Sequence, residues 1–450
     1  MLDVRITAHQ PLALGVRPAG TAPVATHLHI PGSVLRGALA AAWLLDHGPL
    51  AQAPTRARRE FLALFEGQVA YGPLFAPGSH VVPLSVLRCK YRKCALVVDE
   101  AFPGQETRSC PCGPLEPGRG AVEFAGPGRG QRVTENTRLQ IDDRTGVAEE
   151  GLLFTRRALA HRDAQGGLRT FHGRLSAGSD LPEAAARWLA ASRRLRLGGR
   201  RSTSGSVTFT AHRAERPRPV SGQRLALRLT APAVLTDASG LPLDPADLRA
   251  VREALHAELS PLLGGAEVTA VERVWARRER VGGWHAASRL PKPVELAVSA
   301  GSVLLLAFDR PPAPEALGAL AARGLGLRRH EGFGALEVAS TSWVPPAGTE
   351  PAPDGAAGSD PAERPARLLH STGHAAWFLD QLRPYVLQPG DGPAGPATAL
   401  LGRPQLRRLT PSQRQEVTDL LENASAELLD RVLLLLEALH RFSTDGAPSS

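Results

Sequence analysis

Polar and apolar positions alternate over residues 2–14, and this period of two predicts that the chain opens with a β-strand. After a turn at residues 29–32, apolar positions recur at helical spacing to about residue 45, and a second short helix is predicted over residues 57–66. Ser33, at the start of the first helix, has the hydroxyl side chain typical of an N-cap, and such a helix end can also bind phosphate.

Further along, the pattern of strands and helices has a recognisable order. A strand is predicted at residues 225–229, a helix at 245–259, strands around 268–280 and 294–308, a helix beginning at residue 314, and a final strand near 335–338. The order strand–helix–strand–strand–helix–strand is that of a ferredoxin-like domain. We therefore predict an α+β fold for this part of the chain.

Two glycine-rich loops, at residues 198–205 and 324–334, follow predicted helices and lead into predicted strands. Each carries an adjacent pair of arginines, Arg200–Arg201 in the first loop and Arg328–Arg329 in the second. Glycine allows the backbone to adopt positive φ and to approach a ligand closely, and the guanidinium fork matches phosphate geometry. Because the same loop occurs twice in the same local context, we predict a duplicated module that binds a polyanion.

The positive net charge of the chain favours a negatively charged partner. The chain of 450 residues carries a formal charge of +9, and nearly all of its basic residues are arginine. A GC-rich genome explains most of this arginine bias, but the clustering at the two loops and at residues 273–289 is more informative. No apolar run reaches the length of about 20 residues that crosses a bilayer, and no signal-peptide pattern precedes the first strand, so a cytoplasmic location without membrane contact is expected.

All four cysteines lie within residues 84–116, as the close pairs Cys89–Cys94 and Cys110–Cys112. Two close pairs are typical of a four-thiolate zinc site that closes a small surface insertion. The spacings are looser than the usual zinc knuckle, so thiols without metal, or redox thiols, remain the alternative. We expect structural zinc as the cofactor.

Residues 132–160 contain a turn at 143–146 between two extended segments, which predicts a hairpin or protruding finger bearing Arg138 and Arg144. A solvated hairpin without function is the alternative. A stretch rich in proline, alanine and glycine at residues 344–367 predicts a linker, and the helical periodicity beyond it predicts a small bundle over residues 368–450, with helices at 370–387 and 425–442. Before this linker we predict two domains. The first covers residues 1–218 and contains the cysteine insertion and the finger, and the second covers residues 219–343.

Taken in order, these features resemble the RAMP superfamily of CRISPR-associated proteins. The resemblance rests on residues 30–37 (Ile-Pro-Gly-Ser-Val-Leu-Arg-Gly), on the finger with residues 151–154, and on the two glycine loops, and it covers roughly residues 1–340. Two tandem modules with a cysteine insertion and a helical tail look most like the large RAMP subunit of type III-D effector complexes. The resemblance implies two tandem ferredoxin-like (RRM-like) domains.

The resemblance also implies a role: binding CRISPR RNA and capping its 5′ handle, beside the large polymerase-like subunit and the backbone RAMP subunits, with target RNA reached only indirectly. The finger would intercalate into the guide RNA or brace it, and the helical tail would dock neighbouring subunits. The residues expected to bind RNA are Ser33, Arg36, Arg138, Arg144, Gly198, Gly199, Arg200, Arg201, Ser202, Gly205, Gly326, Arg328, Arg329, His330, Gly332 and Gly334.

One departure from the family concerns catalysis. Subunits that cleave target RNA carry an aspartate just before the Ile-Pro-Gly motif, and residues 23–29 contain no carboxylate here. We therefore expect a subunit that is not an enzyme. The alternative is a metal-independent endoribonuclease that processes CRISPR transcripts with His27 and His29 as acid–base groups. A basic scaffold protein of another ribonucleoprotein is the third reading.

Overall fold

The structure is a computed structural model, and it divides into two compact units, Met1–Pro351 and Ala352–Ser450. The described residues are 1–16, 25–67, 69–91, 96–102, 110, 112–120, 122–124, 133–141, 148–162, 167–178, 180–199, 204–285, 290–345, 362–372, 374–387, 403, 410, 414–415, 417–420 and 426–444.

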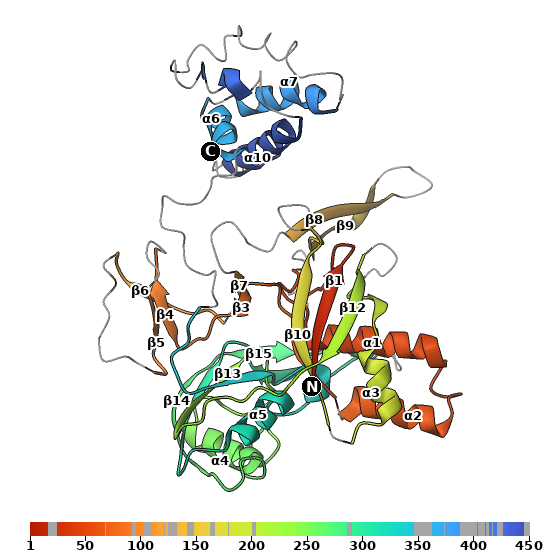
Figure 1. Ribbon diagram of the computed structural model, residues 1–450, viewed down its shortest axis with the longest axis vertical. Coiled ribbons are helices and arrows are strands. Elements are labelled where there is room, and N and C mark those ends of the chain that lie inside the picture. The colour runs from red at the N-terminus through yellow and green to blue at the C-terminus, as the bar shows by residue number, and fades with distance from the viewer. Residues whose placement is uncertain are drawn as a thin grey trace. The chain divides into compact units, whose positions relative to one another are not determined.

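The first module contains an antiparallel sheet of five strands in the order β11-β12-β1-β10-β2 (Figure 1). The central strand β1 pairs with β12 on one side and with β10 on the other. Helices α1 and α3 pack on one face of the sheet. The bounds are β1 Leu2–Ala8, α1 Gly32–His47, α2 Thr55–Leu62, η1 Ala63–Gly67, β2 Val69–Tyr71, β10 Thr170–Ala177, α3 Glu183–Ala190, β11 Arg193–Arg196 and β12 Ser206–Arg213.

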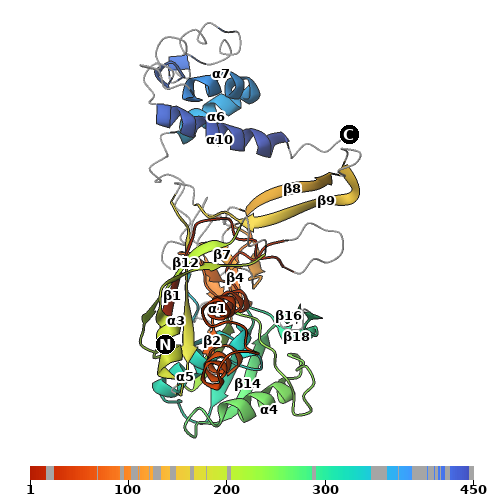
Figure 2. The same cartoon turned by 90° about the vertical axis from the view of Figure 1, so that its right-hand side faces the viewer.

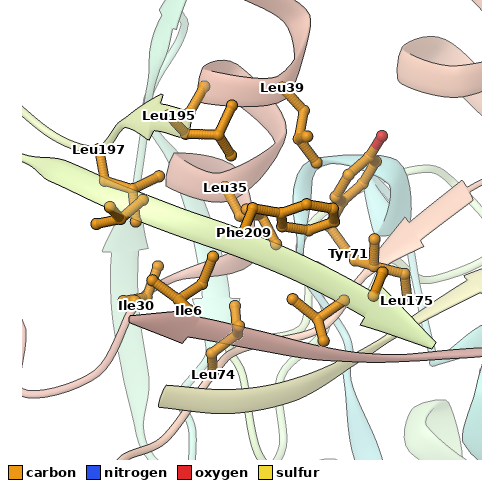
Figure 3. Close-up of a cluster of buried hydrophobic side chains, with 14 of the residues drawn as sticks. Ile6, Ile30, Leu35, Leu39, Tyr71, Leu74, Leu175, Leu195, Leu197 and Phe209 are labelled. Carbon is orange, nitrogen blue, oxygen red and sulfur yellow. The ribbon is translucent and has the colours of Figure 1, made fainter. Parts of the chain in front are cut away.

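The alternation seen in the sequence decides which side chains enter the core of this module. Val4 and Ile6 of β1 are almost fully buried in this core. Figure 3 shows Ile6 close to Phe209 of β12, Leu35 of α1 and Tyr71 of β2. The intervening residues of the same strands lie on the opposite face. At α1, the helix begins at Gly32 with Pro31 as the cap, so Ser33 is not the N-cap expected from its hydroxyl.

The second module contains an antiparallel sheet of four strands in the order β14-β19-β13-β20, with helices α4 and α5 on one face. Asp247 caps α4 by accepting hydrogen bonds from the amides of Arg249 and Ala250. The bounds are β13 Arg224–Leu229, α4 Leu248–Leu259, β14 Val268–Trp275, β19 Val303–Phe308, α5 Pro314–Arg323, η2 Arg329–Glu331 and β20 Leu336–Ala339.

The cysteine insertion covers the other face of this second sheet. Ala101 and Phe102 pack against Ala226, Val303 and Leu305, whose side chains point away from α4 and α5. Strands β13 and β19 are therefore apolar on both faces, because both are covered. The strands of the insertion are β3 Ser79–Val81, β4 Val86–Cys89, β5 Val97–Asp99, β6 Leu115–Pro117 and β7 Val122–Phe124.

Each module carries an inserted hairpin between its second and third sheet strands. In the first module it is the finger expected from the sequence, made of β8 (Val133–Ile141) and β9 (Ala148–Leu159) (Figure 2). In the second it is an arm formed by β15 and β18, with the short pair β16 and β17 at its tip. The bounds of the arm are β15 Arg278–Val281, β16 Trp284–His285, β17 Leu290–Pro291 and β18 Glu295–Val298.

The second unit is helical and has an apolar core of its own. Helices α6 (Glu363–Ser371), α7 (Ala375–Leu387) and α10 (Ala426–Thr444) contribute the buried side chains, Phe378 and Val432 among them. The single helix expected at residues 370–387 is in fact two, since α6 ends at Ser371 and α7 begins at Ala375. Helix α6 begins at Glu363, within the stretch expected as linker.

Candidate nucleic-acid interface

The two glycine loops have the same backbone hydrogen bonds, which supports the duplication inferred from the sequence. The amide of Leu197 donates to the carbonyl of Gly205 over 2.8 Å, and the amide of Leu325 donates to that of Gly334 over 2.9 Å. Each closing glycine also donates to a proline carbonyl, Gly205 to Pro11 and Gly334 to Pro232. Sequence reasoning missed the segments that begin at these two prolines, although each follows the first strand of its module.

The closing glycines are required by the geometry. Gly205 has φ +84° and Gly334 has φ +73°, and a Cβ at Gly334 would lie 1.8 Å from the carbonyl oxygen of Leu325. A Cβ at Gly198 would lie 2.4 Å from the carbonyl oxygen of Ala13, and a Cβ at Gly326 would lie 2.4 Å from that of Val234. These glycines shape the loop; their expected contact with RNA remains a prediction.

The second loop packs against the first module through two glycines. A Cβ at Gly332, where φ is +92°, would lie 2.7 Å from both the Cα of Gly32 and the amide nitrogen of Ser33. A Cβ at Gly32 would lie 2.0 Å from the carbonyl oxygen of Tyr71. Backbone therefore meets backbone at this contact, and the first turn of α1, including Ser33, lies against the loop.

Arg328 is held by carboxylates of its own chain. It adopts the left-handed conformation with φ 55°, and its Nε and Nη2 donate to the two oxygens of Glu331 at 3.1 and 2.8 Å. It also pairs with Glu295, and its guanidinium lies over the ring of Phe333. The side chain is 12% exposed. In this arrangement Arg328 fixes the loop, and a phosphate would have to compete with two carboxylates for it.

Glu331 is the centre of this cluster. Burial alone would raise its pKa, but hydrogen bonds from Arg328 and from Lys292, 2.8 Å away, outweigh burial and lower the pKa to about 2. The cluster reaches the first module through His330, whose Nε2 lies 3.8 Å from Glu66. Burial and the nearby Arg36 lower the pKa of His330. Glu66 in turn accepts a hydrogen bond from Arg36, which also donates to the carbonyl of Phe65.

Arg329 is the more accessible arginine of the pair. Its Nη1 donates to the carbonyl of Gly326 over 2.7 Å and to Glu258 over 3.1 Å, yet the side chain remains 32% exposed. Arg329 and Arg323 line a cleft of about 680 Å³ between the two modules, opposite His172 and Arg174 of β10. Each side of the cleft carries arginine, together with one carboxylate, Asp3 on the first module and Glu337 on the second.

Several expected site residues cannot be placed. Arg144 and the three consecutive residues Arg200, Arg201 and Ser202 lie outside the described residues. Arg138 lies on β8 of the finger, in register with Phe154 of β9. Gly199 is placed, and its amide donates to the carbonyl of Ala13 over 3.0 Å. The first loop is thus described only at its two ends.

The histidines considered for catalysis are close together. The rings of His27 and His29 are 5.5 Å apart, and His29 stacks on Phe75. Burial lowers the pKa of His27, and burial with the neighbouring His27 lowers that of His29 to about 3. Both imidazoles are therefore neutral at pH 7, so neither holds the proton that a general acid needs for RNA cleavage.

Three cysteines converge at the end of β4. The sulfur atoms of Cys89, Cys110 and Cys112 all lie within 4.8 Å of one another. Tetrahedral zinc with Zn–S bonds of about 2.3 Å places its sulfurs roughly 3.8 Å apart, so these three thiols fit three corners of such a site. Cys94, the expected fourth ligand, lies outside the described residues.

An anchor that sequence reasoning missed joins the insertion to the second module. Asp99 of β5 is fully buried and pairs with Arg228 of β13, whose side chain is 5% exposed, over 2.9 Å. Asp99 also accepts hydrogen bonds from Ser85, Ala101 and Trp343. No local sequence signal links these residues, because the pair is 129 positions apart.

Trp275 of β14 lies beside this anchor. Its indole nitrogen donates to Glu100 over 2.8 Å, and its ring packs against the insertion. Trp284, at the tip of the arm, is 62% exposed. Of the two tryptophans, only Trp284 presents its ring to solvent.

Comparison with known proteins gives one family match. Residues 134–336 match the family model described as CRISPR-associated protein (Cas_Cmr3). No curated protein matches the chain. Among the described residues, no helix is both long and apolar enough to span a membrane. The matched region contains most of the finger, all of the first loop and the complete second loop.

Solved structures of CRISPR-associated proteins are distantly similar. A chain of the type III-B Cmr-beta complex bound to cognate target RNA and AMPPnP is 11% identical, covers 67% of this chain and 86% of its own, and has a TM-score of 0.37. The CRISPR-associated protein Cas6 is 10% identical, with coverages of 75% and 97% and a TM-score of 0.35. Oligomeric Cmr4 from Pyrococcus furiosus is 10% identical, with coverages of 48% and 98% and a TM-score of 0.22.

Proposed function

We propose that this chain belongs to the Cas_Cmr3 family of CRISPR-associated proteins, whose model matches residues 134–336, and that it is the crRNA-binding subunit that caps the 5′ handle in a type III effector complex. The family match is the observation that carries the proposal. The duplicated glycine loops and the basic cleft beside the second loop support it, because phosphate binding needs arginines and backbone that a ligand can approach.

The proposed fold of both modules is ferredoxin-like. In the second module the sheet order β14-β19-β13-β20 arises from the chain order strand–helix–strand–strand–helix–strand. In the first module, β12-β1-β10-β2 repeats that connectivity and β11 is an added edge strand. The arm of the second module then corresponds to the finger of the first, and both are offered to RNA in this proposal.

Among the expected RNA contacts, the geometry favours Arg329 over Arg328, because Arg329 is more exposed and lines the basic cleft. The remaining candidates in the first loop and the finger stay predictions. The subtype III-D, the neighbouring polymerase-like and backbone subunits, and docking by the helical second unit also belong to this proposal, with target RNA contacted only through the assembled complex.

The experiment that tests the function is recovery of RNA with the full chain from cells that express a type III system. We expect short RNAs that share a common repeat-derived 5′ sequence, and an Arg329→Glu variant should recover fewer of them. Arg249→Glu, an exposed arginine on α4, is the matched control and should recover as many as the unchanged chain. Recovery of unrelated RNAs, or of none, would contradict the proposal.

The same preparation tests for cleavage. Repeat RNA incubated with the protein in EDTA should remain intact, because the lowered pKa values of His27 and His29 leave both imidazoles without the proton of a general acid. Cleavage that is abolished by His27→Ala or His29→Ala would instead make the chain a processing endoribonuclease.

We further propose that the cysteine cluster holds structural zinc. Cys89, Cys110 and Cys112 would be ligands, and Cys94 would complete the four-thiolate set. Elemental analysis of freshly purified protein should find close to one zinc per chain, and a Cys89→Ser variant should lose most of it. Less than half a zinc per unchanged chain would count against the site.

A further inference from the structure

The face of the first sheet that points away from α1 and α3 carries polar side chains in ordered rows. Because Val4, Ile6 and Ala8 of β1 face the core, the odd-numbered residues of that strand lie on this face. Strands β12 and β10 pair with β1 in register, so each odd residue has a neighbour on both sides. The rows, read from β12 through β1 to β10, are His212–Asp3–Arg174, Thr210–Arg5–His172 and Thr208–Thr7–Thr170.

The edge strand β11 extends this face, which we call the open face. Arg194 lies opposite Thr208, and Arg196 lies opposite Ser206. Leu195 between them points to the core and is buried. Rows of this kind recur about every 6.8 Å along a strand, and neighbouring strands are about 4.8 Å apart, so the side chains form a lattice of donors.

Positive charge predominates on the open face. Its four arginines (Arg5, Arg174, Arg194 and Arg196) are all exposed, and Asp3 is the carboxylate among them. Asp3 pairs with Arg174 over 3.1 Å, and Arg196 donates to the side chain of Gln10. Among the described residues, Arg5 and Arg194 have no ion-pair partner. The face therefore carries net charge that its own carboxylate does not neutralise.

Residues at one end of the open face line the cleft between the modules. Asp3, His172 and Arg174 line that cleft, and Arg323 and Arg329 line it from the second module. The basic residues of the sheet are thus continuous with the accessible arginine of the second glycine loop. A strand of polyanion that contacts Arg329 could continue across β10, β1 and β12.

The equivalent face of the second sheet is closed. There the side chains are Ala226, Val303 and Leu305, and the cysteine insertion covers them. In contrast, the rows of the open face contain no apolar side chain that another protein core would cover. They also contain no phenylalanine, tyrosine or tryptophan on which a base would stack.

We propose that the open face of the first sheet binds the phosphate backbone of a single RNA strand, independently of base sequence. The proposal rests on the proposed function, and it extends the path of the bound RNA from the cleft across the sheet. Arginine supplies charged donors to phosphate, and the hydroxyl of Thr7 in the rows can donate to phosphate or to 2′-hydroxyl oxygens. Affinity gained in this way falls steeply with salt.

The test measures binding of a fluorescein-labelled oligouridine to the full chain over a range of salt concentrations. The variant Arg5→Glu/Arg194→Glu should bind at least about tenfold more weakly, and its log–log salt slope should be shallower by about 1.4, since each lost phosphate contact on a single strand removes about 0.7. A milder Arg5→Gln/Arg194→Gln variant should show the same slope change with a smaller loss of affinity.

The matched control is Arg56→Glu/Arg187→Glu, which changes the net charge equally. Arg56 on α2 and Arg187 on α3 have side chains 82% and 73% exposed, and both lie on the helical side of the sheet. The control should lose less than about twofold in affinity. Equal losses in both double variants would overturn the proposal, because they would reflect net charge alone. The midpoint of urea unfolding verifies that every variant is folded.

Other outcomes separate this proposal from the function on which it rests. If the unchanged chain bound neither oligouridine nor repeat RNA, both proposals would fail. If Arg329→Glu weakened binding and the open-face variant did not, the open-face proposal alone would fail. If polyglutamate displaced oligouridine at equal charge concentration, the partner would be an acidic protein segment, and the RNA assignment of this face would be overturned.

Discussion

At the residue scale, a buried ion pair and a half-buried ion cluster hold the parts of the first unit together. The pair Asp99–Arg228 joins the cysteine insertion to the second sheet, and the cluster around Glu331 joins the second loop to the first module. Each carboxylate is satisfied by several donors, which is the condition under which a buried charge is tolerated. Neither cluster has a free charge to offer a ligand until one of its own partners is displaced.

The Asp99–Arg228 pair leads to a stability prediction. An Asp99→Ala variant should lose about 3–5 kcal/mol of unfolding free energy, because the buried guanidinium of Arg228 would be left without its carboxylate. Arg224 is the matched control, since it lies on the same strand and pairs with Glu272 at the surface. Arg224→Ala should cost less than about 1 kcal/mol. Urea denaturation of both variants gives the comparison, and similar losses would show that Asp99 is not an anchor.

Glu331 predicts an acid sensitivity. Its pKa of about 2 lies below the ordinary 4.5, so ionised Glu331 stabilises the fold above pH 4.5 and this contribution is lost as the pH falls toward 2. Between pH 5 and pH 3, the unchanged chain should lose about 1–2 kcal/mol more stability than Glu331→Gln, after allowance for solvent screening. Parallel pH dependences of the two urea midpoints would contradict this assignment.

At the element scale, the alternation of polar and apolar residues along a strand reflects what covers each face of its sheet. Strand β1 alternates because one face is core and the other is open, whereas β13 and β19 are apolar throughout because the insertion covers their second face. The glycines of the two loops likewise reflect close packing of the loop backbone against neighbouring carbonyl groups. In both loops a glycine stands where a Cβ would meet a carbonyl, so part of the glycine signal reports the fold and not the ligand.

Gly332 tests how much the loop-to-helix contact contributes. Gly332→Ala should destabilise the chain by about 2–4 kcal/mol, since it adds both a strained positive φ and a collision with the backbone of Gly32. Gly240 is the matched control, because it has φ +78° and open space around it. Gly240→Ala should cost only the strain, about 1–2 kcal/mol. Equal losses in thermal unfolding would mean that the contact is loose.

At the scale of the whole molecule, the chain is a pair of similar modules followed by a separate helical unit. Each apolar core cluster lies within one of the two units, and those of the first unit are linked by the insertion and by the second loop. The proposed RNA path uses surfaces of the first unit alone: the cleft, the open face, the finger and the loops.

Removal of residues 352–450 should therefore leave the first unit folded. Calorimetry of the chain 1–351 should show one cooperative transition within a few degrees of the corresponding transition of the full chain, because no core side chain of the first unit is lost. Oligouridine affinity should change less than about twofold. Aggregation of the shortened chain, or loss of the transition, would show that the helical unit supports the first.

The sequence by itself determined the local elements of this protein. Its periodicities placed the first strand, the finger, α5 and α10, and the repeated pattern of glycine and arginine predicted a duplicated module, because such signals depend on neighbours a few residues apart. The two close cysteine pairs indicated a cluster, and the structure brings three of the four thiols together. The match of residues 134–336 to the Cas_Cmr3 family model agrees with the family resemblance stated from these motifs.

Only the tertiary structure decided what those elements touch. It placed the cysteine insertion on the second sheet, paired Asp99 with Arg228, and turned Arg328 toward Glu331 and away from a ligand. It also left the basic face of the first sheet open. Arg328 and Glu331 are only three positions apart, but the other outcomes depend on contacts between residues more than a hundred positions apart, such as Asp99 and Arg228. The free energy of those contacts comes from burial and from the pairing of charge. No local pattern of residues encodes such contacts, and they decide which arginines are available to RNA.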